Sequence, residues 1–283
     1  MSAAVPSAAR VTVPALQGMK RAGRKIVGVV AWDHPMARLA DRAGVDIVSV
    51  GDSVGVNLWG HATPLEVTLD EMVLVCKAVR RGVARALVSC DFPFGPLQQG
   101  IDAALAAAIR LVKEAGADMV KLDGAADFPD AVRAITRAGI PVFAQIGISP
   151  QTAAQHGVDY AAMLGGGVEV PLDMTARLVD EARRLEEAGA ALLDFQSSGP
   201  VVGPAVAGAV AIPVVGGMGG GPWLDGRMRM AHAAIGYAPS WLDATTETYA
   251  NVARVTLEAL GAYADDVRAG RQIKGGVRPK PSA

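Results

Sequence analysis

Short apolar runs alternate along the chain with segments whose apolar positions recur at helical spacing. The runs predict strands near residues 25–32, 46–51, 85–90, 118–122, 140–145, 190–194 and 212–216. The helical segments are 35–44, 68–83, 100–116, 129–139, 173–189 and 200–211. Runs without polar alternation are typical of parallel strands that are buried on both faces. The alternation therefore predicts an α/β fold: a (β/α)₈ TIM barrel with a parallel eight-stranded sheet.

Glycine ends three of the predicted helices a few residues before the next strand. Gly82, Gly116 and Gly189 hold these positions, which matches the preference for glycine at helix C-termini. The eighth unit has a weaker pattern. An eighth strand is expected near 227–235, although this run is polar, and a long helix is expected over about 244–268.

Polar side chains stand at the ends of the predicted strands. Asp52 and Asp91 end successive strands, and Asp123 ends the next one. In a barrel, strand ends meet at one mouth, where active sites are built. Mg²⁺ is held by one or two carboxylates together with water and substrate. We predict a metal site at Asp52 and Asp91, with Asp123 as a direct or water-mediated third contact. The alternative interpretation is that each aspartate only caps the following helix.

Lys121 lies two residues before Asp123, so both side chains point to the same side of the strand. We predict that Lys121 holds a substrate carboxylate or an oxyanion. A salt bridge to Asp123 alone is one alternative. A Schiff-base lysine is another, although the surrounding acids keep the pKa of such an amine high.

Asp194 ends the sixth predicted strand, far in sequence from the metal candidates. A position across the mouth suits a general base, which must reach the substrate without serving as a metal ligand. Ser53 is predicted to donate its hydroxyl to the bound carboxylate. The glycine run after residue 215 offers backbone N–H groups to an anion, or it serves close packing alone.

Composition excludes several other classes of function. The formal net charge is −1, so no basic field is present for nucleic acid or for an anionic membrane surface. No apolar run approaches the roughly 20 residues that span a bilayer, and no signal-peptide pattern precedes residue 25. Cys76 and Cys90 are the two cysteines and are predicted to be buried, reduced thiols in a cytoplasmic protein. We predict an N-terminal extension over 1–24, one barrel domain over 25–270 and a flexible basic tail over 271–283.

The motifs together resemble the ketopantoate hydroxymethyltransferase (3-methyl-2-oxobutanoate hydroxymethyltransferase) family. The resemblance is densest in VSVGDSVGVNLWGHATPLEVTLDEM. It continues through RALVSCDFPF, AGADMVKLDG, GIPVFAQIGISPQT, AGAALLDFQ and IPVVGGMGGG, and covers about residues 11 to 236. The segment with VGDS and the following GH is specific, because a barrel as such does not require it.

The resemblance implies a barrel of the phosphoenolpyruvate mutase/isocitrate lyase superfamily that depends on Mg²⁺. It implies transfer of a hydroxymethyl group from the co-substrate 5,10-methylenetetrahydrofolate to a branched 2-oxo acid in pantothenate synthesis. It also implies a homo-oligomer, often a decamer. By motif, Asp52 and Asp91 match metal-associated acids, and Asp52, Ser53, Asp91 and Lys121 match substrate-contacting positions.

Three site positions depart from the family pattern. The family has glutamate where this chain has Asp123, histidine where it has Gln145, and a catalytic glutamate where it has Asp194. Each shorter acid loses one methylene of reach, and misplacing a reacting group by about 1 Å costs on the order of 100-fold in rate. A paralogue acting on another 2-oxo acid is therefore also considered, with Gln145 at a substrate-binding position. Further alternatives are a metal-dependent 2-oxo acid aldolase or C–C lyase without folate, and a non-catalytic ligand-binding barrel.

Overall fold

The computed structural model describes residues 9–164 and 167–276. The chain divides into two compact units, one that ends at Met230 and one that begins at Ala231. Each unit is described by itself. The predicted domain boundaries at residues 24 and 270 stay predictions, and residues 1–8 and 277–283 of the two predicted terminal segments lie outside the described residues.

Eight parallel strands close into a barrel in chain order, β1 to β8. They are β1 (Ile26–Val30), β2 (Ile47–Val50), β3 (Leu87–Asp91), β4 (Met119–Leu122), β5 (Val142–Gly147), β6 (Leu192–Gln196), β7 (Val214–Gly216) and β8 (Gly226–Met230). Pairing of β1 with β8 closes the sheet, with Ile26 opposite Gly226 and Val30 opposite Met230. The predicted (β/α)₈ barrel is confirmed.

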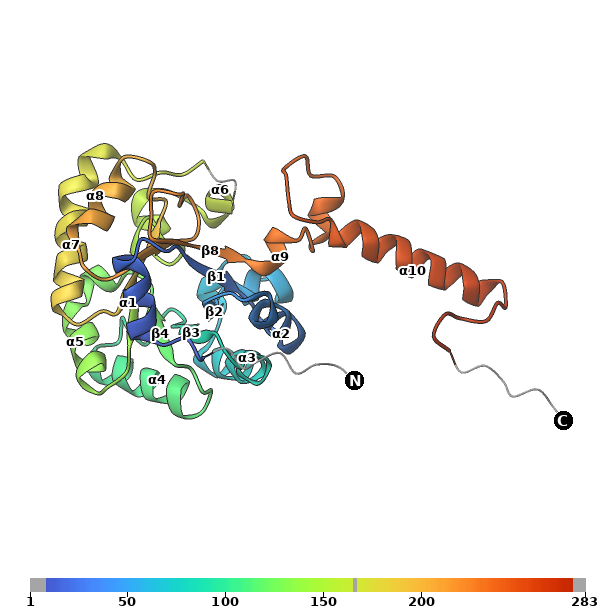
Figure 1. Ribbon diagram of the computed structural model, residues 1–283, viewed down its shortest axis with the longest axis horizontal. Coiled ribbons are helices and arrows are strands. Elements are labelled where there is room, and N and C mark those ends of the chain that lie inside the picture. Colours follow the sequence, from blue (N-terminus) through green and yellow to red (C-terminus); the bar gives the residue numbers. More distant parts are fainter. Residues whose placement is uncertain (1–8, 165–166, 277–283) are drawn as a thin grey trace. The chain divides into compact units, whose positions relative to one another are not determined.

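Helices surround the strands (Figure 1). They are α1 (Val13–Arg21), α2 (His34–Ala43), α3 (Leu69–Gly82), α4 (Ile101–Lys113), α5 (Pro129–Arg137), α6 (Tyr160–Leu164), α7 (Thr175–Glu187) and α8 (Val202–Ala209). The helices α2–α5, α7 and α8 confirm the six predicted segments to within a few residues at each end. Between β7 and β8 a loop without a helix, residues 217–225, makes the connection.

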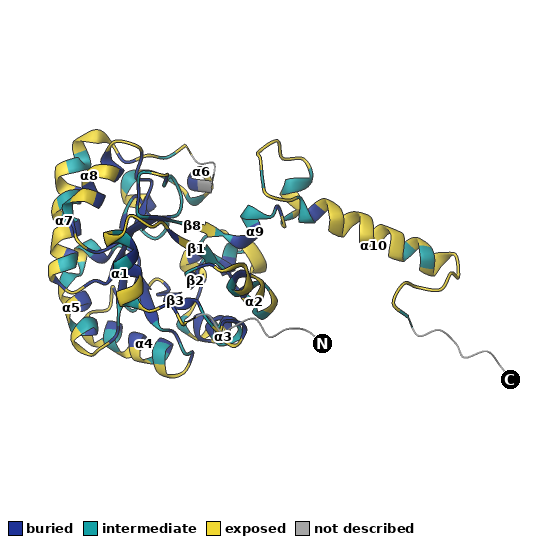
Figure 2. Ribbon diagram, in the orientation of Figure 1, coloured by how far each residue is buried: buried dark blue, intermediate teal, exposed yellow. Residues whose placement is uncertain are grey.

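The N-terminal end of the barrel is closed by apolar packing. Ile47, Met119 and Phe143 fill the interior there together with Leu16 and Met19 of α1. All five side chains are buried. Most of the strands are buried, although β1 and β8 are partly exposed, and the outer faces of the helices are exposed (Figure 2). The apolar packing fills the N-terminal end, so the predicted site residues lie at the opposite, C-terminal end of the strands. This end is called the barrel mouth below.

The eighth unit differs from the prediction. Strand β8 ends at Met230 rather than near 235, and the long helix α10 (Val252–Arg268) begins at Val252 rather than near 244. In β8, Gly226 and Met228 are buried, Arg227 is half-buried and Arg229 is exposed, so the two arginines make a partly buried strand look polar in the sequence. The α10 helix begins where the Asn251 side chain accepts a hydrogen bond from the backbone N–H of Arg254, as an N-cap does.

Gly82 has a different role from the predicted one. It is the last residue of α3 and is not among the glycines with positive φ, unlike Gly116 and Gly189. A Cβ atom at Gly82 would lie 2.7 Å from the carbonyl oxygen of His34 in α2. Glycine is therefore required for the close approach of α3 to the start of α2 and not for a left-handed helix end.

The second unit contains α9 (Ala231–Ala234) and α10. Along α10 the side chains of Val255, Leu257, Leu260 and Tyr263 are exposed. In the described part of the chain, every helix is too short or too polar to cross a bilayer.

Candidate active site

The predicted site residues converge at the barrel mouth. Asp91 is the last residue of β3 and pairs in register with Lys121 on β4, while Gln145 on β5 pairs with Asp194 on β6. Asp123 directly follows β4, and Asp52 lies two residues beyond the end of β2. All six side chains are buried. The strand register therefore brings together residues that are separated by up to 142 positions in the sequence, from Asp52 to Asp194 (194 − 52).

Lys121 lies between two carboxylates. Its Nζ is 3.0 Å from Oδ2 of Asp194 and 3.4 Å from Oδ2 of Asp91. Burial alone would lower the pKa of this ammonium, but Asp91 and Asp194 outweigh burial and raise the pKa above its ordinary value. The raised pKa favours the protonated amine, which argues against the Schiff-base alternative. Its ion pairs are with Asp91 and Asp194, so a salt bridge to Asp123 alone is excluded.

Asp194 is 1% exposed and lies in the middle of β6 rather than at its end. One carboxylate oxygen, Oδ2, contacts Lys121. The other, Oδ1, is buried and has no hydrogen-bond partner among the described residues. A buried carboxylate oxygen without a donor is unfavourable unless a ligand contacts it. Asp194 thus has one oxygen oriented by Lys121 and a second, fully buried oxygen that lacks a donor.

Asp52 and Asp91 are neighbours that repel each other electrostatically. Burial and the nearby Asp91 carboxylate raise the pKa of Asp52 to about 8. The pKa of Asp91 is also raised by burial, although Lys121 opposes the shift. Two adjacent buried carboxylates suit a hard divalent cation, because such a cation binds oxygen ligands. A bound cation would also offset the repulsion between the two carboxylates. Among the described residues, however, there is no group of three acidic, histidine or cysteine side chains arranged around one metal position.

Asp123 is hydrogen-bonded on both oxygens. Oδ1 accepts a hydrogen bond from the Ser149 hydroxyl, and Oδ2 accepts from Nε2 of Gln145 at 3.2 Å and from the backbone N–H of Gln151 at 2.9 Å. Burial raises the pKa of Asp123 to about 6, against the effect of the Ser149 and Gln151 hydrogen bonds. With these donors in place, Asp123 is better placed for a water-mediated contact to a metal than for a direct one.

Gln151 is a site residue that sequence reasoning missed. Its Nε2 donates to Oδ2 of Asp52 at 2.8 Å and to the backbone oxygen of Phe92 at 2.8 Å. With its backbone N–H on Asp123, Gln151 connects the segments that follow β2, β3 and β4. The segment GISPQT was visible in the sequence, but nothing in it indicated that a residue after β5 would contact an acid after β2.

Two further side chains near Asp52 were also missed. Tyr160, at the start of α6, forms a hydrogen bond with the side chain of Asn57, and burial together with the nearby Asp52 raises its pKa to about 12. Asn57 lies in a short π-helix, Gly55–Trp59, and donates to the backbone oxygen of Ser53 at 2.8 Å. The hydroxyl of Ser53 itself has no hydrogen-bond partner among the described residues and is therefore available to a ligand.

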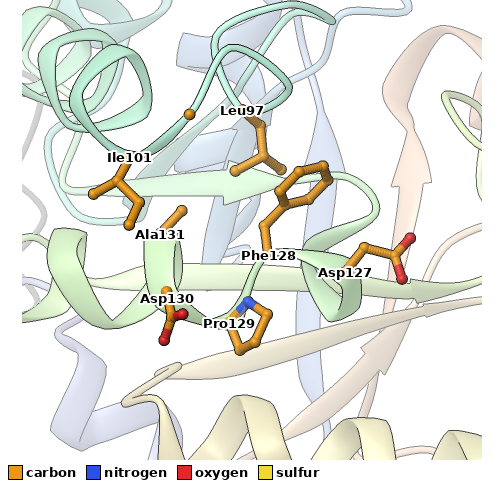
Figure 3. Close-up of a pocket in the computed structure, with 8 residues that line it drawn as sticks. Leu97, Ile101, Asp127, Phe128, Pro129, Asp130 and Ala131 are labelled. Carbon is orange, nitrogen blue, oxygen red and sulfur yellow. The ribbon is translucent and has the colours of Figure 1, made fainter.

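Strand-end acids do not all belong to the site. Asp33, which follows β1, accepts a hydrogen bond from the backbone N–H of Met36 at 2.8 Å and caps α2. Both cysteines are buried and free, as predicted. A hollow of about 180 Å³ lies elsewhere, between the starts of α4 and α5, and is shown in Figure 3. Leu97, Ile101 and Phe128 line it, and none of the buried acids at the barrel mouth contributes to it.

Comparison with known sequences agrees with the motifs. The model of the ketopantoate hydroxymethyltransferase family matches residues 10–272. The chain is 38% identical to the 3-methyl-2-oxobutanoate hydroxymethyltransferase of Moorella thermoacetica over 93% of this chain and 95% of that protein. It is also 38% identical to the 3-methyl-2-oxobutanoate hydroxymethyltransferase of Salinibacter ruber, over 92% of this chain and 95% of that one.

Solved structures support the fold. The chain resembles 2,3-dimethylmalate lyase, a member of the PEP mutase/isocitrate lyase superfamily, with a TM-score of 0.60 and 15% identity over 93% of this chain and 90% of that one. It resembles phosphonopyruvate hydrolase in complex with oxalate and Mg²⁺ with a TM-score of 0.57 and 15% identity, over 94% and 91% of the two chains. By the extent and identity of the sequence matches, the chain belongs to the ketopantoate hydroxymethyltransferase family, whose members are transferases.

Proposed function

We propose that this protein transfers a hydroxymethyl group from 5,10-methylenetetrahydrofolate to C3 of a 2-oxo acid, with Mg²⁺ as cofactor. Membership of the family supports the reaction class. The observation that carries the site assignment is Asp194, which has one carboxylate oxygen fixed by Lys121 and the other buried without a partner. We assign Asp194 as the base that removes the C3 proton.

Substrate binding is assigned to the polar groups around Lys121. The protonated Lys121 and the hydroxyl of Ser53 would hold the carboxylate of the 2-oxo acid. Asp52 and Asp91 would hold Mg²⁺, with Asp123 behind a water molecule. Gln145, which donates to Asp123, would keep that acid in place and border the substrate. When bound, Mg²⁺ would supply a Lewis acid that stabilises negative charge on the keto oxygen.

Proton removal then depends on residues of this chain. Oδ1 of Asp194 accepts the C3 proton, while Lys121 holds Oδ2 and keeps the carboxylate oriented. In the net reaction, both bonds between the methylene carbon and the folate nitrogens break. A C–C bond to C3, made with the electron pair left there, and a C–O bond to one water molecule replace them. The proton taken from C3 and one proton of that water end on the two nitrogens of the released tetrahydrofolate. The burial of Asp194 excludes bulk water from the base, which strengthens its interaction with the substrate.

The decisive experiment is proton exchange at C3 of 3-methyl-2-oxobutanoate in D₂O, followed by NMR, with Mg²⁺ and with EDTA. Exchange that requires Mg²⁺ is the expected result, and 5,10-methylenetetrahydrofolate should then convert the substrate to the hydroxymethylated product. Exchange without any folate-dependent product would instead identify a metal-dependent 2-oxo acid aldolase or C–C lyase. Absence of both exchange and Mg²⁺ binding would identify a non-catalytic barrel.

Assembly and location are part of the same proposal. The family resemblance supports a homo-oligomer, with a decamer as the expected size, in the cytoplasm. Sedimentation equilibrium of the purified protein measures the oligomeric state directly. A monomer at micromolar concentration would contradict the proposed homo-oligomer.

A further inference from the structure

Gln196 is the last residue of β6 and lies two residues beyond Asp194. Side chains two apart on a strand point to the same face, so both project toward the interior of the barrel. Gln196 is in register with Gly147 on β5 and is only 5% exposed. The proposed mechanism gives this side chain no role, although a buried amide is costly unless its polar atoms are bonded.

The orientation of the Gln196 amide is set by a single hydrogen bond. Its Oε1 accepts from the backbone N–H of Met218 at 2.8 Å. Because the oxygen faces that N–H group, the nitrogen must face the other way. Nε2 has no hydrogen-bond partner among the described residues. It is not among the fully buried unpaired atoms, so it still borders accessible space. Gln196 therefore presents two unused N–H donors.

The neighbouring strands leave room for this amide. A Cβ atom at Gly217, which follows β7, would lie 2.9 Å from Nε2 and 3.1 Å from Oε1 of Gln196. On the other side, Gly147 has a φ of +91°, and a Cβ atom there would clash with the backbone oxygen of Gln196. Glycine at position 217 thus leaves room for the Gln196 amide, and glycine at position 147 permits the close approach of β5 to the backbone of Gln196.

We propose that Gln196 is a specificity-determining residue, whose amide donates a hydrogen bond to a neutral oxygen on the side chain of the 2-oxo acid. The inference rests on the proposed function, in which Asp194 acts at C3. Two residues along a strand cover roughly 6.6 Å, so a group held by Gln196 lies beyond C3 on the substrate side chain. The oxygen is neutral because a carboxylate there would face Asp194, whose cation Lys121 is already shared with Asp91.

The expected discrimination follows from the unpaired donors. A substrate with a methyl group at this position would leave the amide hydrogens buried without an acceptor. A substrate with a hydroxyl group would satisfy one of them. Leaving a buried donor unsatisfied corresponds to a loss of about tenfold or more in affinity.

Two ligands of equal heavy-atom count test this directly: 4-hydroxy-2-oxobutanoate and 2-oxopentanoate, which differ by hydroxyl against methyl. Calorimetric titration with Mg²⁺ present and folate absent should show at least about tenfold tighter binding of the hydroxy acid by the native protein. Gln196→Leu should abolish this preference, and Gln155→Leu, at an exposed position in the same chain, should retain it. If Gln196→Leu does not fold, Gln196→Glu replaces donors with acceptors at constant size and should also abolish the preference.

Equal binding of the two acids by the native protein would overturn the proposal. The proposal would also be overturned if both Gln196 variants kept the preference for the hydroxy acid. It would be overturned as well if the Gln196 substitutions changed only the affinity for tetrahydrofolate. The C3 exchange experiment with 3-methyl-2-oxobutanoate is a separate measurement of the proposed function. Exchange at C3 without a preference for the hydroxy acid would support the proposed function and rule out Gln196 as a specificity determinant. A preference for the hydroxy acid without exchange on any 2-oxo acid would support the role of Gln196 in binding and contradict the proposed function.

Discussion

Nζ of Lys121 on β4 lies 3.0 Å from Oδ2 of Asp194 on β6, two strands away in the barrel. The same ammonium lies 3.4 Å from Asp91 on β3. One cation therefore joins the candidate base to an acid of the candidate metal site. From the sequence, Asp194 is expected across the mouth from the metal acids, and in the structure the Lys121 side chain lies between Asp194 and Asp91.

Removing the charge of Asp194 should abolish proton abstraction. We expect Asp194→Asn to reduce the rate of C3 exchange by about 10²- to 10⁴-fold, the range for loss of a general base. Mg²⁺ affinity, measured by calorimetry, should change little. Asp33→Asn is a matched control, because this strand-end acid caps α2 and asparagine caps helices equally well. Exchange at the native rate in Asp194→Asn would assign the base elsewhere.

Removing the charge of Lys121 should destabilise the fold. Lys121→Met would leave Asp91 and Asp194 buried without their cation, and breaking a buried ion pair from one side costs about 3–5 kcal/mol. Urea unfolding at pH 7 in EDTA measures this cost. The exposed Lys113 provides the control Lys113→Met, which should stay within about 0.5 kcal/mol of the native protein. A similar small change for Lys121→Met would show that the acids are not ionised together.

The raised pKa of Asp52 predicts a pH dependence of stability. The pKa of Asp52 is about 8 in the folded protein, against a reference value of 3.8 in the unfolded chain. At a pH between these two pKa values, Asp52 is protonated in the folded state and ionised in the unfolded state. Stability of the metal-free protein should therefore fall as the pH rises from about 4 through 8. Asp52→Asn should flatten this decline and raise Tm at pH 8 by about 3 °C or more, on the order of 1 kcal/mol. Calorimetric scans of both proteins in EDTA across this range check the prediction, and parallel declines would contradict it.

Gln151 should organise the two acids that it contacts. Gln151→Ala removes the donors to Asp52 and Phe92 but keeps the backbone N–H that Asp123 accepts. We expect a loss of about 1–3 kcal/mol in unfolding free energy and weaker binding of Mn²⁺, measured by electron paramagnetic resonance as free ion. Gln155→Ala, on the same segment but exposed, should alter neither quantity. Unchanged Mn²⁺ affinity in a destabilised Gln151→Ala protein would limit Gln151 to a structural role.

The fold and most of the site were predictable from local sequence. The apolar runs that end in Asp91, Lys121 and Asp194 indicate strands that are buried on both faces. Such strands are apolar because one face packs in the barrel interior and the other packs against the helices. Their common location follows from the barrel itself, since all strand ends meet at one mouth. The same reasoning could not separate Asp33 from Asp52, because a capping acid and a site acid occupy the same place in the pattern.

By itself, the sequence determined most of the strands and helices, which carboxylates lie toward the C-terminal ends of the strands, and to which family the chain belongs. Only the tertiary structure decided that Lys121 pairs with Asp91 and Asp194, that Gln151 contacts Asp52, and that Gln196 presents unused donors beside Gly217. Periodicity reports which face of a strand a side chain occupies, and that is a local property of the backbone. Which partner it meets depends on register and loop closure between distant segments, and no local pattern encodes those.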